Sequence, residues 1–147
     1  MLYSGCYESC KGNLCVSISA DKGKSASFEG KNYLDLAPKA EFWRTWRNNI
    51  GKISEEENTK FYIHEYYNQV LKNLDPYKIL KDLDNCIMLC YEKENEFCHR
   101  HLVAFWLEEK LKIHVPEVKV TDSGCLLKLE RPEYLRQLLL NEMNLPS

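Results

Sequence analysis

The sequence of 147 residues has no long apolar run and no excess of charge of one sign. No stretch approaches the roughly 20 apolar residues of a membrane helix, and no basic segment precedes an apolar one as in a secretion signal. The formal net charge is -2, so the strongly basic balance typical of duplex-binding proteins is absent. These absences predict a cytoplasmic protein without a membrane partner, and charge gives no indication of a nucleic-acid partner.

The common metal-binding motifs are also missing. There is no His-Glu-x-x-His, and the His-x-Glu plus Cys-x-x-Cys pair of zinc deaminases is absent. Seven cysteines, an odd number in a chain without a secretion signal, indicate free thiols rather than a disulfide framework. Cys6, Cys10 and Cys15 are separated by three and four residues, which fits no zinc knuckle. We therefore expect no metal and no cofactor.

The strand patterns are short and spread along the whole chain. Apolar and small polar residues predict strands over residues 2–7 and 14–19, and an apolar run predicts another over 86–90. Residues 20–32 are rich in Gly, Ser and Lys and are predicted to form a long loop. Residues 115–120 and 125–130 flank the turn signal Thr121-Asp122-Ser123-Gly124, which predicts a hairpin.

Helical patterns separate these strands. Pro38 is predicted to open a helix that runs to Ile50, and Ser54 with Glu57 forms a capping box ahead of the next helix. Further helices are predicted after residue 75, from residue 98 and from residue 131. Strands that alternate with helices predict a single α/β domain over residues 1–147. We expect three layers and a mostly parallel sheet with an antiparallel edge hairpin.

The segment CYEKENEFCHR, residues 90–100, carries an unusual group of side chains. Cys90 ends a predicted central strand, and Cys98, His99 and Arg100 lie in the first turn of the next helix. Ligands of open α/β sheets bind at the carboxyl edge, and helix amino ends attract anions. Arg100 adds a planar fork that suits carboxylate or phosphate. The segment therefore predicts a site for a small anionic or nucleotide ligand, with Ser4 or Gly5 of the first strand facing it.

The two thiols of this segment suggest catalysis. A thiol at a helix amino end, beside a histidine and an arginine, is expected to favour its thiolate form. Cys98 fits this description best and Cys90 is the second candidate nucleophile. Glu92 or His99 would move a proton.

Two other interpretations use the same residues. In the architectural one, the cysteine packs under the loop and Arg100 pairs with Glu92 or Glu94 to hold the loop shut. In the metal interpretation, Cys90, Cys98 and His99 supply three corners of a zinc site. Neighbouring side chains on a helix diverge by about 100°, however, so residues 98 and 99 are not expected to converge on one ion.

At these residues a family resemblance is specific. IMLCYEKENEFCHRHLVAFWLEE resembles the signature of the domain-of-unknown-function family 488, in which a strand ends in Cys-x-Glu and Cys-His-Arg opens a helix. The matching positions are Cys90, Glu92, Cys98, His99 and Arg100. LYSGCYES, FEGKNYLDLAP and FYIHEYYNQVLKNLDPYKILKDL extend the resemblance over residues 1–118, which leaves an edge strand and a last helix in residues 119–147. The resemblance implies a Rossmann-like fold and no defined activity.

The chain departs from the family pattern after its second strand. Many members have Asp-Val-Arg and a proline-serine pair there, whereas residues 17–21 of this chain read SISAD. An acid and a base are thus missing, and Lys22, Lys24 and Ser25 are candidates to supply polar function in their place. Two hypotheses follow: an enzyme that acts on a nucleotide, a nucleoside or a nucleic-acid end, and a non-catalytic binding or regulatory module. The sequence does not indicate an oligomeric state.

Overall fold

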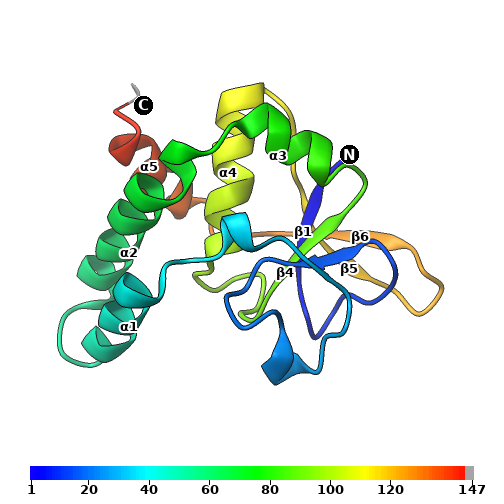
Figure 1. The fold of residues 1–147 in the computed structure, drawn as a ribbon, viewed down its shortest axis with the longest axis horizontal. Coiled ribbons are helices and arrows are strands. Elements are labelled where there is room, and N and C mark those ends of the chain that lie inside the picture. The colour runs from blue at the N-terminus through cyan, green and yellow to red at the C-terminus, as the bar shows by residue number, and fades with distance from the viewer. Residues whose placement is uncertain (145–147) are drawn as a thin grey trace.

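The computed structural model describes residues 1–144 and is built around one six-stranded sheet (Figure 1). The strand order is β3-β2-β4-β1-β5-β6, and every neighbouring pair is parallel except β5 with β6. The strands are β1 (Tyr3–Cys6), β2 (Cys15–Ser17), β3 (Lys31–Asn32), β4 (Ile87–Cys90), β5 (Glu117–Val120) and β6 (Leu126–Leu129). This confirms the predicted mostly parallel sheet with an antiparallel edge pair.

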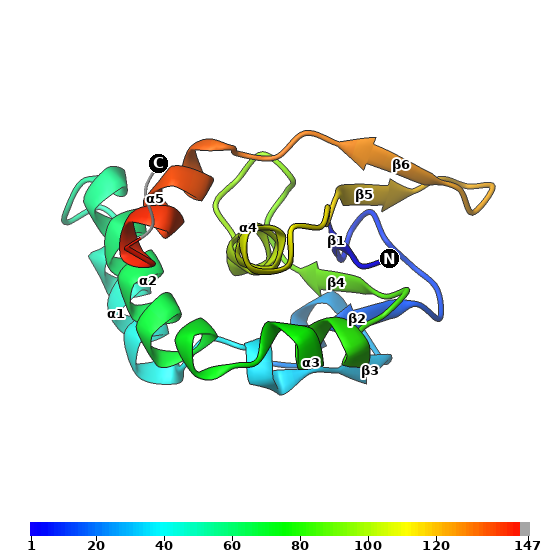
Figure 2. The same ribbon diagram turned by 90° about the horizontal axis from the view of Figure 1, so that it is seen from above.

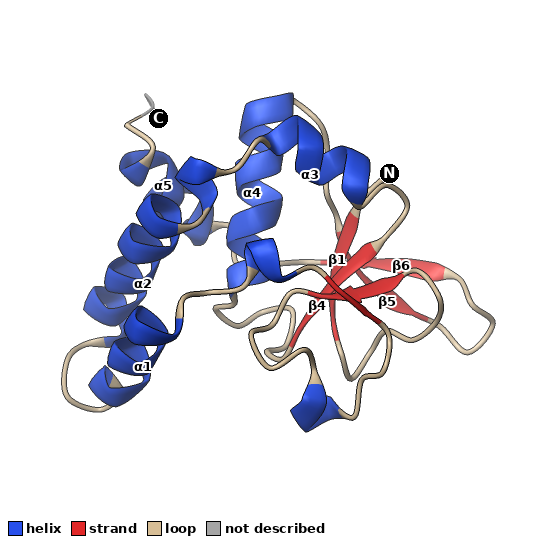
Figure 3. Cartoon of the chain, viewed as in Figure 1, coloured by secondary structure: helices blue, strands red, loops and turns tan. Residues whose placement is uncertain are grey.

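Five α-helices flank the sheet (Figure 3). Helix α4 follows β4 directly, and α1 with α2 and α5 forms a separate group further from the strands. The helices are α1 (Ala40–Asn49), α2 (Glu55–Gln69), α3 (Pro76–Asp82), α4 (His99–Leu111) and α5 (Tyr134–Glu142). The α/β class predicted from the alternating patterns is therefore confirmed.

Side-chain capping marks the starts of α2 and α3. The Ser54 hydroxyl accepts a hydrogen bond from the Glu57 backbone N–H at the start of α2, and Asp75 caps α3 in the same way. The prediction for Pro38 is wrong by two residues. Helix α1 begins at Ala40 with Lys39 as its cap, so Pro38 lies before the helix rather than in its first position.

Residues 20–32 are more structured than the predicted loop. They contain a short 3-10 turn over Lys24–Ala26 and end in the edge strand β3. Strand β3 pairs with β2 through Lys31 and Asn32 only. Two residues are too few to show the alternation that marks a strand, so the sequence pattern could not reveal it.

The two faces of the sheet are covered differently (Figure 2). Crossovers between parallel strands are almost always right-handed, so the direction in which a crossover moves along the sheet decides the face that it covers. The crossovers from β3 to β4 and from β4 to β5 both move toward the β6 edge, and their helices therefore lie on the same face. The crossover from β1 to β2 runs in the opposite direction and is a loop, residues 7–14. The hydrophobic cluster on that second face contains strand and loop residues only: Tyr7, Cys10, Cys15, Ile87, Leu89 and Val118. Loops therefore form the third layer.

This topology creates a switch point between β1 and β4. The two strands are neighbours, yet the connections that follow them leave on opposite faces of the sheet. Their carboxyl ends meet where Cys6 lies opposite Cys90. Such a point is where open α/β sheets usually bind ligands. Across residues 1–144, no helix has both the length and the apolar character needed to span a bilayer.

Candidate functional site

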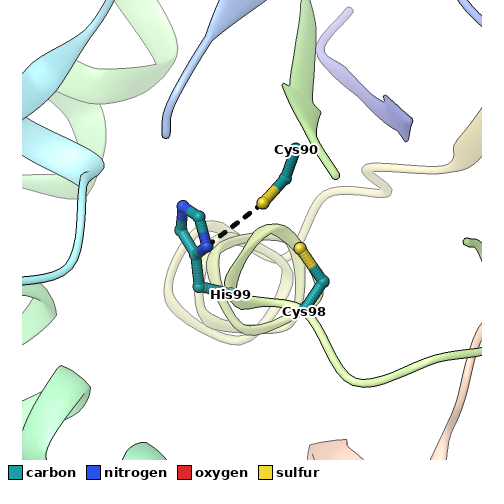
Figure 4. A group of neighbouring side chains, drawn as sticks. All are labelled: Cys90, Cys98 and His99. Carbon is teal, nitrogen blue, oxygen red and sulfur yellow. Dashed lines mark hydrogen bonds between the residues drawn. The ribbon is translucent and has the colours of Figure 1, made fainter. Parts of the chain in front are cut away.

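Three of the predicted site residues converge at the carboxyl end of β4 (Figure 4). Cys90 comes from the end of the strand, while Cys98 and His99 come from the start of α4. The two sulfur atoms and a ring nitrogen of His99 all lie within 4.8 Å of one another. Cys90 Sγ is 3.4 Å from His99 Nδ1. We call these three residues the thiol–imidazole cluster.

The orientation of the His99 ring is fixed by the backbone of the neighbouring strand. His99 Nε2 lies 2.9 Å from the carbonyl oxygen of Ile18, just beyond β2. A carbonyl only accepts hydrogen bonds, so Nε2 carries the proton in the neutral ring. Nδ1 is then left with its lone pair directed at the Cys90 thiol. The geometry pairs His99 with Cys90.

Cys98 and His99 converge because only one of them is helical. Cys98 is the N-cap of α4 and has extended backbone angles, φ -155° and ψ 146°. The divergence of about 100° between neighbours applies to two residues inside a helix, not to a cap and the residue after it. The sequence argument against their convergence is therefore wrong.

The expectation that the helix end favours the Cys98 thiolate is also wrong. Burial raises the pKa of the Cys98 thiol well above its usual range, and the neighbouring Cys90 raises it further. Arg100 and His99 act in the opposite direction, but they do not outweigh burial. Burial therefore favours the thiol form of Cys98, and Cys90 is the cysteine whose sulfur faces the lone pair of His99 Nδ1.

Arg100 lies inside the protein and is bound to an acid from another strand. Its side chain is fully buried, and its Nε and Nη2 donate to the Glu117 carboxylate of β5 at 2.8 to 3.2 Å. The alternative partners Glu92 and Glu94 are thus wrong. Burial acts to lower the pKa of Arg100, but Cys98 and Glu117 raise it. Among residues 1–144, Arg100 Nη1 has no hydrogen-bond partner.

Ser4 and Gly5 have separate local roles in β1. The Ser4 hydroxyl donates to Glu117 Oε1 at 2.6 Å, which makes it the third member of a buried Ser4–Glu117–Arg100 network. At Gly5, a Cβ atom would lie 2.5 Å from Cys10 Sγ and 3.0 Å from the Val118 carbonyl oxygen. Gly5 therefore permits the loop of residues 7–14 to pack against the sheet. Anion binding by either residue stays a prediction.

Glu92 lies on the loop between β4 and α4 and is half-buried. Burial raises the pKa of its carboxyl, while the charges of His99 and Arg100 partly oppose that shift. Glu92 is thus close enough to the thiol–imidazole cluster to interact with it electrostatically. Its predicted part in proton transfer stays a prediction.

Three hydroxyl groups at this edge were not among the predicted site residues. Tyr7, at the end of β1, is hydrogen-bonded through its hydroxyl to Ser17 and Ser19, at 2.5 and 2.9 Å. The Ser19 hydroxyl in turn contacts Cys90 Sγ at 3.8 Å. The departure of residues 17–21 from the family pattern, noted in the sequence, was the available signal for Ser17 and Ser19. The sequence contained no signal for Tyr7, because only the strand order places it near Ser17 and Ser19.

The thiol–imidazole cluster is enclosed. The exposed fractions of Cys90, Cys98 and His99 are 3%, 1% and 5%. Tyr91 of the following loop packs on Tyr7 and donates a hydrogen bond to Asp21, which ties residues 91–97 to the segment after β2. Access to the sulfur atoms therefore requires these segments to move.

Comparison with known families gives one result. The family model DUF488-N3a, described as the active DUF488-N3 subclade, matches residues 20–111, which is well over half of the chain. Comparison with curated proteins and with solved structures gave no match. The matched segment includes Cys90, Glu92, Cys98, His99 and Arg100, the residues that carry the resemblance. The chain therefore belongs to the DUF488 family, in its N3a subclade.

Proposed function

We propose that this protein is an enzyme in which Cys90 attacks the substrate and His99 is its general base. The observation that carries the proposal is the 3.4 Å contact between Cys90 Sγ and the lone pair of His99 Nδ1. The Ile18 carbonyl, which binds the other ring nitrogen, acts as the orienting third group. Cys98, the first candidate nucleophile from the sequence, takes second place because burial raises its pKa.

The reaction is a hydrolysis in two steps. The Cys90 proton moves to His99 Nδ1 as the sulfur bonds to an electrophilic carbon of the substrate, and the leaving group departs with the electron pair and that proton. Water then attacks the same carbon and transfers a proton through His99 to the departing Cys90 sulfur. The enzyme is restored, and the net change is addition of one water across the broken bond. Glu92 is the candidate for a second proton transfer.

Three features support an anionic substrate such as a nucleotide or a nucleic-acid end. The cluster lies at the amino end of α4, where the helix dipole favours negative charge. Arg100 keeps one donor, Nη1, without a partner among residues 1–144, and its charge acts on both Cys98 and Glu92. The site also lies at the switch point of the sheet, beside the ends of β1 and β4. The matched family model is itself described as active.

The test is a turnover assay on a defined substrate panel. Nucleosides, nucleotides and short single-stranded DNA are incubated with the protein in the presence of chelator, and products are separated by chromatography. We expect turnover of at least one class, reduced at least about 100-fold in Cys90→Ser and in His99→Asn. Cys125→Ser is the matched control, because Cys125 is exposed in the β5–β6 turn. Circular dichroism checks that each variant folds.

Two outcomes contradict the proposal. One is turnover that Cys90→Ser leaves unchanged. The other is that the wild-type protein converts no member of the panel to product and is thermally stabilised by none of them.

A non-catalytic binding or regulatory module is the second candidate. It is favoured by the buried Ser4–Glu117–Arg100 network, which joins the start of α4 to β1 and β5. If the motif only holds these elements together, Arg100→Ala lowers the melting temperature and changes nothing else. Loss of turnover in Cys90→Ser at an unchanged melting temperature would contradict this candidate.

A further inference from the structure

The donor atoms of the thiol–imidazole cluster are close to the spacing of a metal site. Cys90 Sγ and His99 Nδ1 are 3.4 Å apart, and Cys98 Sγ completes a group within 4.8 Å. Zinc bonds of about 2.3 Å to sulfur and 2.0 to 2.1 Å to nitrogen place tetrahedral ligands roughly 3.5 to 3.8 Å apart. The Cys90–His99 pair is already near this range, and the wider separations in the group, at most 4.8 Å, would have to contract to it to bring all three donors around one ion.

The His99 tautomer suits metal binding. The Ile18 carbonyl holds the proton on Nε2, so Nδ1 offers its lone pair toward the two sulfurs. A ligating histidine in proteins usually donates its second N–H to a carbonyl or carboxylate in this way, which fixes the ring and raises its basicity. The Ser19 hydroxyl, 3.8 Å from Cys90 Sγ, gives the first sulfur a similar outer contact.

The composition and burial of the cluster select the kind of ion. Two thiolates and an imidazole are soft or borderline ligands, which favour Zn²⁺ over Mg²⁺ or Ca²⁺. Two thiolates also neutralise a divalent cation, so the complex carries no net charge into a site whose ligands are at most 5% exposed. Three protein ligands leave one tetrahedral position for a water or a substrate atom.

We propose that Cys90 Sγ, Cys98 Sγ and His99 Nδ1 bind one Zn²⁺ ion. Binding deprotonates both thiols, so one Zn²⁺ enters and two protons leave. The inference goes beyond the proposed function, because the ion occupies the sulfur and the lone pair that the Cys90–His99 pair needs for attack. Zinc binding therefore switches off the thiol chemistry, and the metal-free protein is the reactive form.

The test begins with Co²⁺ as a spectroscopic probe. Chelator-treated protein is titrated with Co²⁺ and the thiolate-to-cobalt charge-transfer absorption is followed, and Zn²⁺ then displaces the Co²⁺. We expect one ion per chain, with Zn²⁺ affinity reduced at least about 100-fold in Cys90→Ser, Cys98→Ser and His99→Asn. Cys125→Ser is the control and binds like the wild type. No charge-transfer band, or a band that persists unchanged in Cys98→Ser, overturns the proposal.

Turnover with and without metal separates this proposal from the enzymatic one. If the protein turns over substrate in chelator and added Zn²⁺ abolishes that turnover, both proposals are supported. If one Zn²⁺ binds per chain and only the metal-loaded protein turns over substrate, the metal site is supported. That result would contradict inhibition by Zn²⁺ and the mechanism in which Cys90 is the nucleophile. Turnover in chelator without any Zn²⁺ binding keeps the enzyme and overturns the metal site.

Discussion

The two ends of α4 both bury ionisable groups, but they satisfy them to different degrees. At the carboxyl end, Glu108 accepts hydrogen bonds from the Val115 backbone and from Arg131 and Arg136, at 2.8 to 2.9 Å. At the amino end, Arg100 Nη1 and both ring nitrogens of His101 have no partner among residues 1–144. A saturated network stabilises, whereas an unpaired buried polar atom costs about 1 to 3 kcal/mol. The unpaired buried atoms therefore lie at the end of the helix where we propose the site.

The largest effect is expected from removing the acid at the amino end. Glu117→Gln leaves the fully buried Arg100 charge without a counter-ion, which should lower the free energy of unfolding by about 3 to 5 kcal/mol. Urea denaturation measures this. The double variant Arg100→Leu with Glu117→Leu removes both charges and should recover most of the loss. A double variant as unstable as the single one would show that burial of the unpaired charge is not the cause.

Removing the acid at the carboxyl end should cost less. Glu108→Gln weakens the hydrogen bonds to Arg131 and Arg136, but Arg131 keeps its bond to the Val115 carbonyl and Arg136 is one-third exposed. We expect a loss of about 2 to 3 kcal/mol in the same urea experiment. Turnover should remain unchanged, because Glu108 lies at the opposite end of α4 from the proposed site. A turnover loss without destabilisation would contradict the division between the two ends.

The Glu108 network should also make stability depend on acid pH. Burial acts to raise the pKa of Glu108, but the Val115 N–H and the two arginines lower it below the ordinary value of 4.5. The unfolded chain therefore takes up the proton first as the pH falls. The contribution of Glu108 is complete above pH 4.5 and is lost as the pH falls through the lower, folded-state pKa. Melting temperatures measured from pH 6 downward should fall less steeply in Glu108→Gln than in the wild type.

The smallest effect is expected at Ser4. Ser4→Ala removes one hydrogen bond to the Glu117 carboxylate but leaves the three hydrogen bonds from Arg100 in place. We expect a loss of about 1 to 2 kcal/mol, again by urea denaturation. A loss as large as that of Glu117→Gln would show that Ser4, and not Arg100, is the main partner of the acid.

The fold was predictable where local chemistry decides it. The cap Ser54 and the hairpin turn Thr121-Asp122-Ser123-Gly124 each act through neighbours in the sequence, and both stand as predicted. Strand β3 was not predictable, because its two residues form a strand only through pairing with β2. The loop layer on the second face depends on strand order, which local patterns do not contain.

The candidate site was predictable in part for the same reason. Cys90, Cys98, His99 and Arg100 lie within eleven residues, so their clustering is visible in the sequence. The partner of Arg100 is Glu117, which lies on β5, after the end of α4 in the sequence. The signal for it was a glutamate inside the apolar strand VPEVKV, since a buried acid requires a cation. The convergence of Cys98 with His99 depends on the extended backbone of the cap, and no side-chain pattern records that.

The strand order has a consequence for synthesis of the chain. Strands β1 and β2 both pair with β4 and not with each other. During synthesis, neither can therefore pair with its central neighbour until residues 87–90 have been made. Such long-range pairing is slow and leaves hydrophobic strands unpaired for longer. The nascent chain therefore completes α1, α2 and α3 before its sheet has a centre. A fragment that ends before β4 would include the residues of these helices but no partner strand for β1. Only the addition of β4 would join β1 and β2 into one sheet.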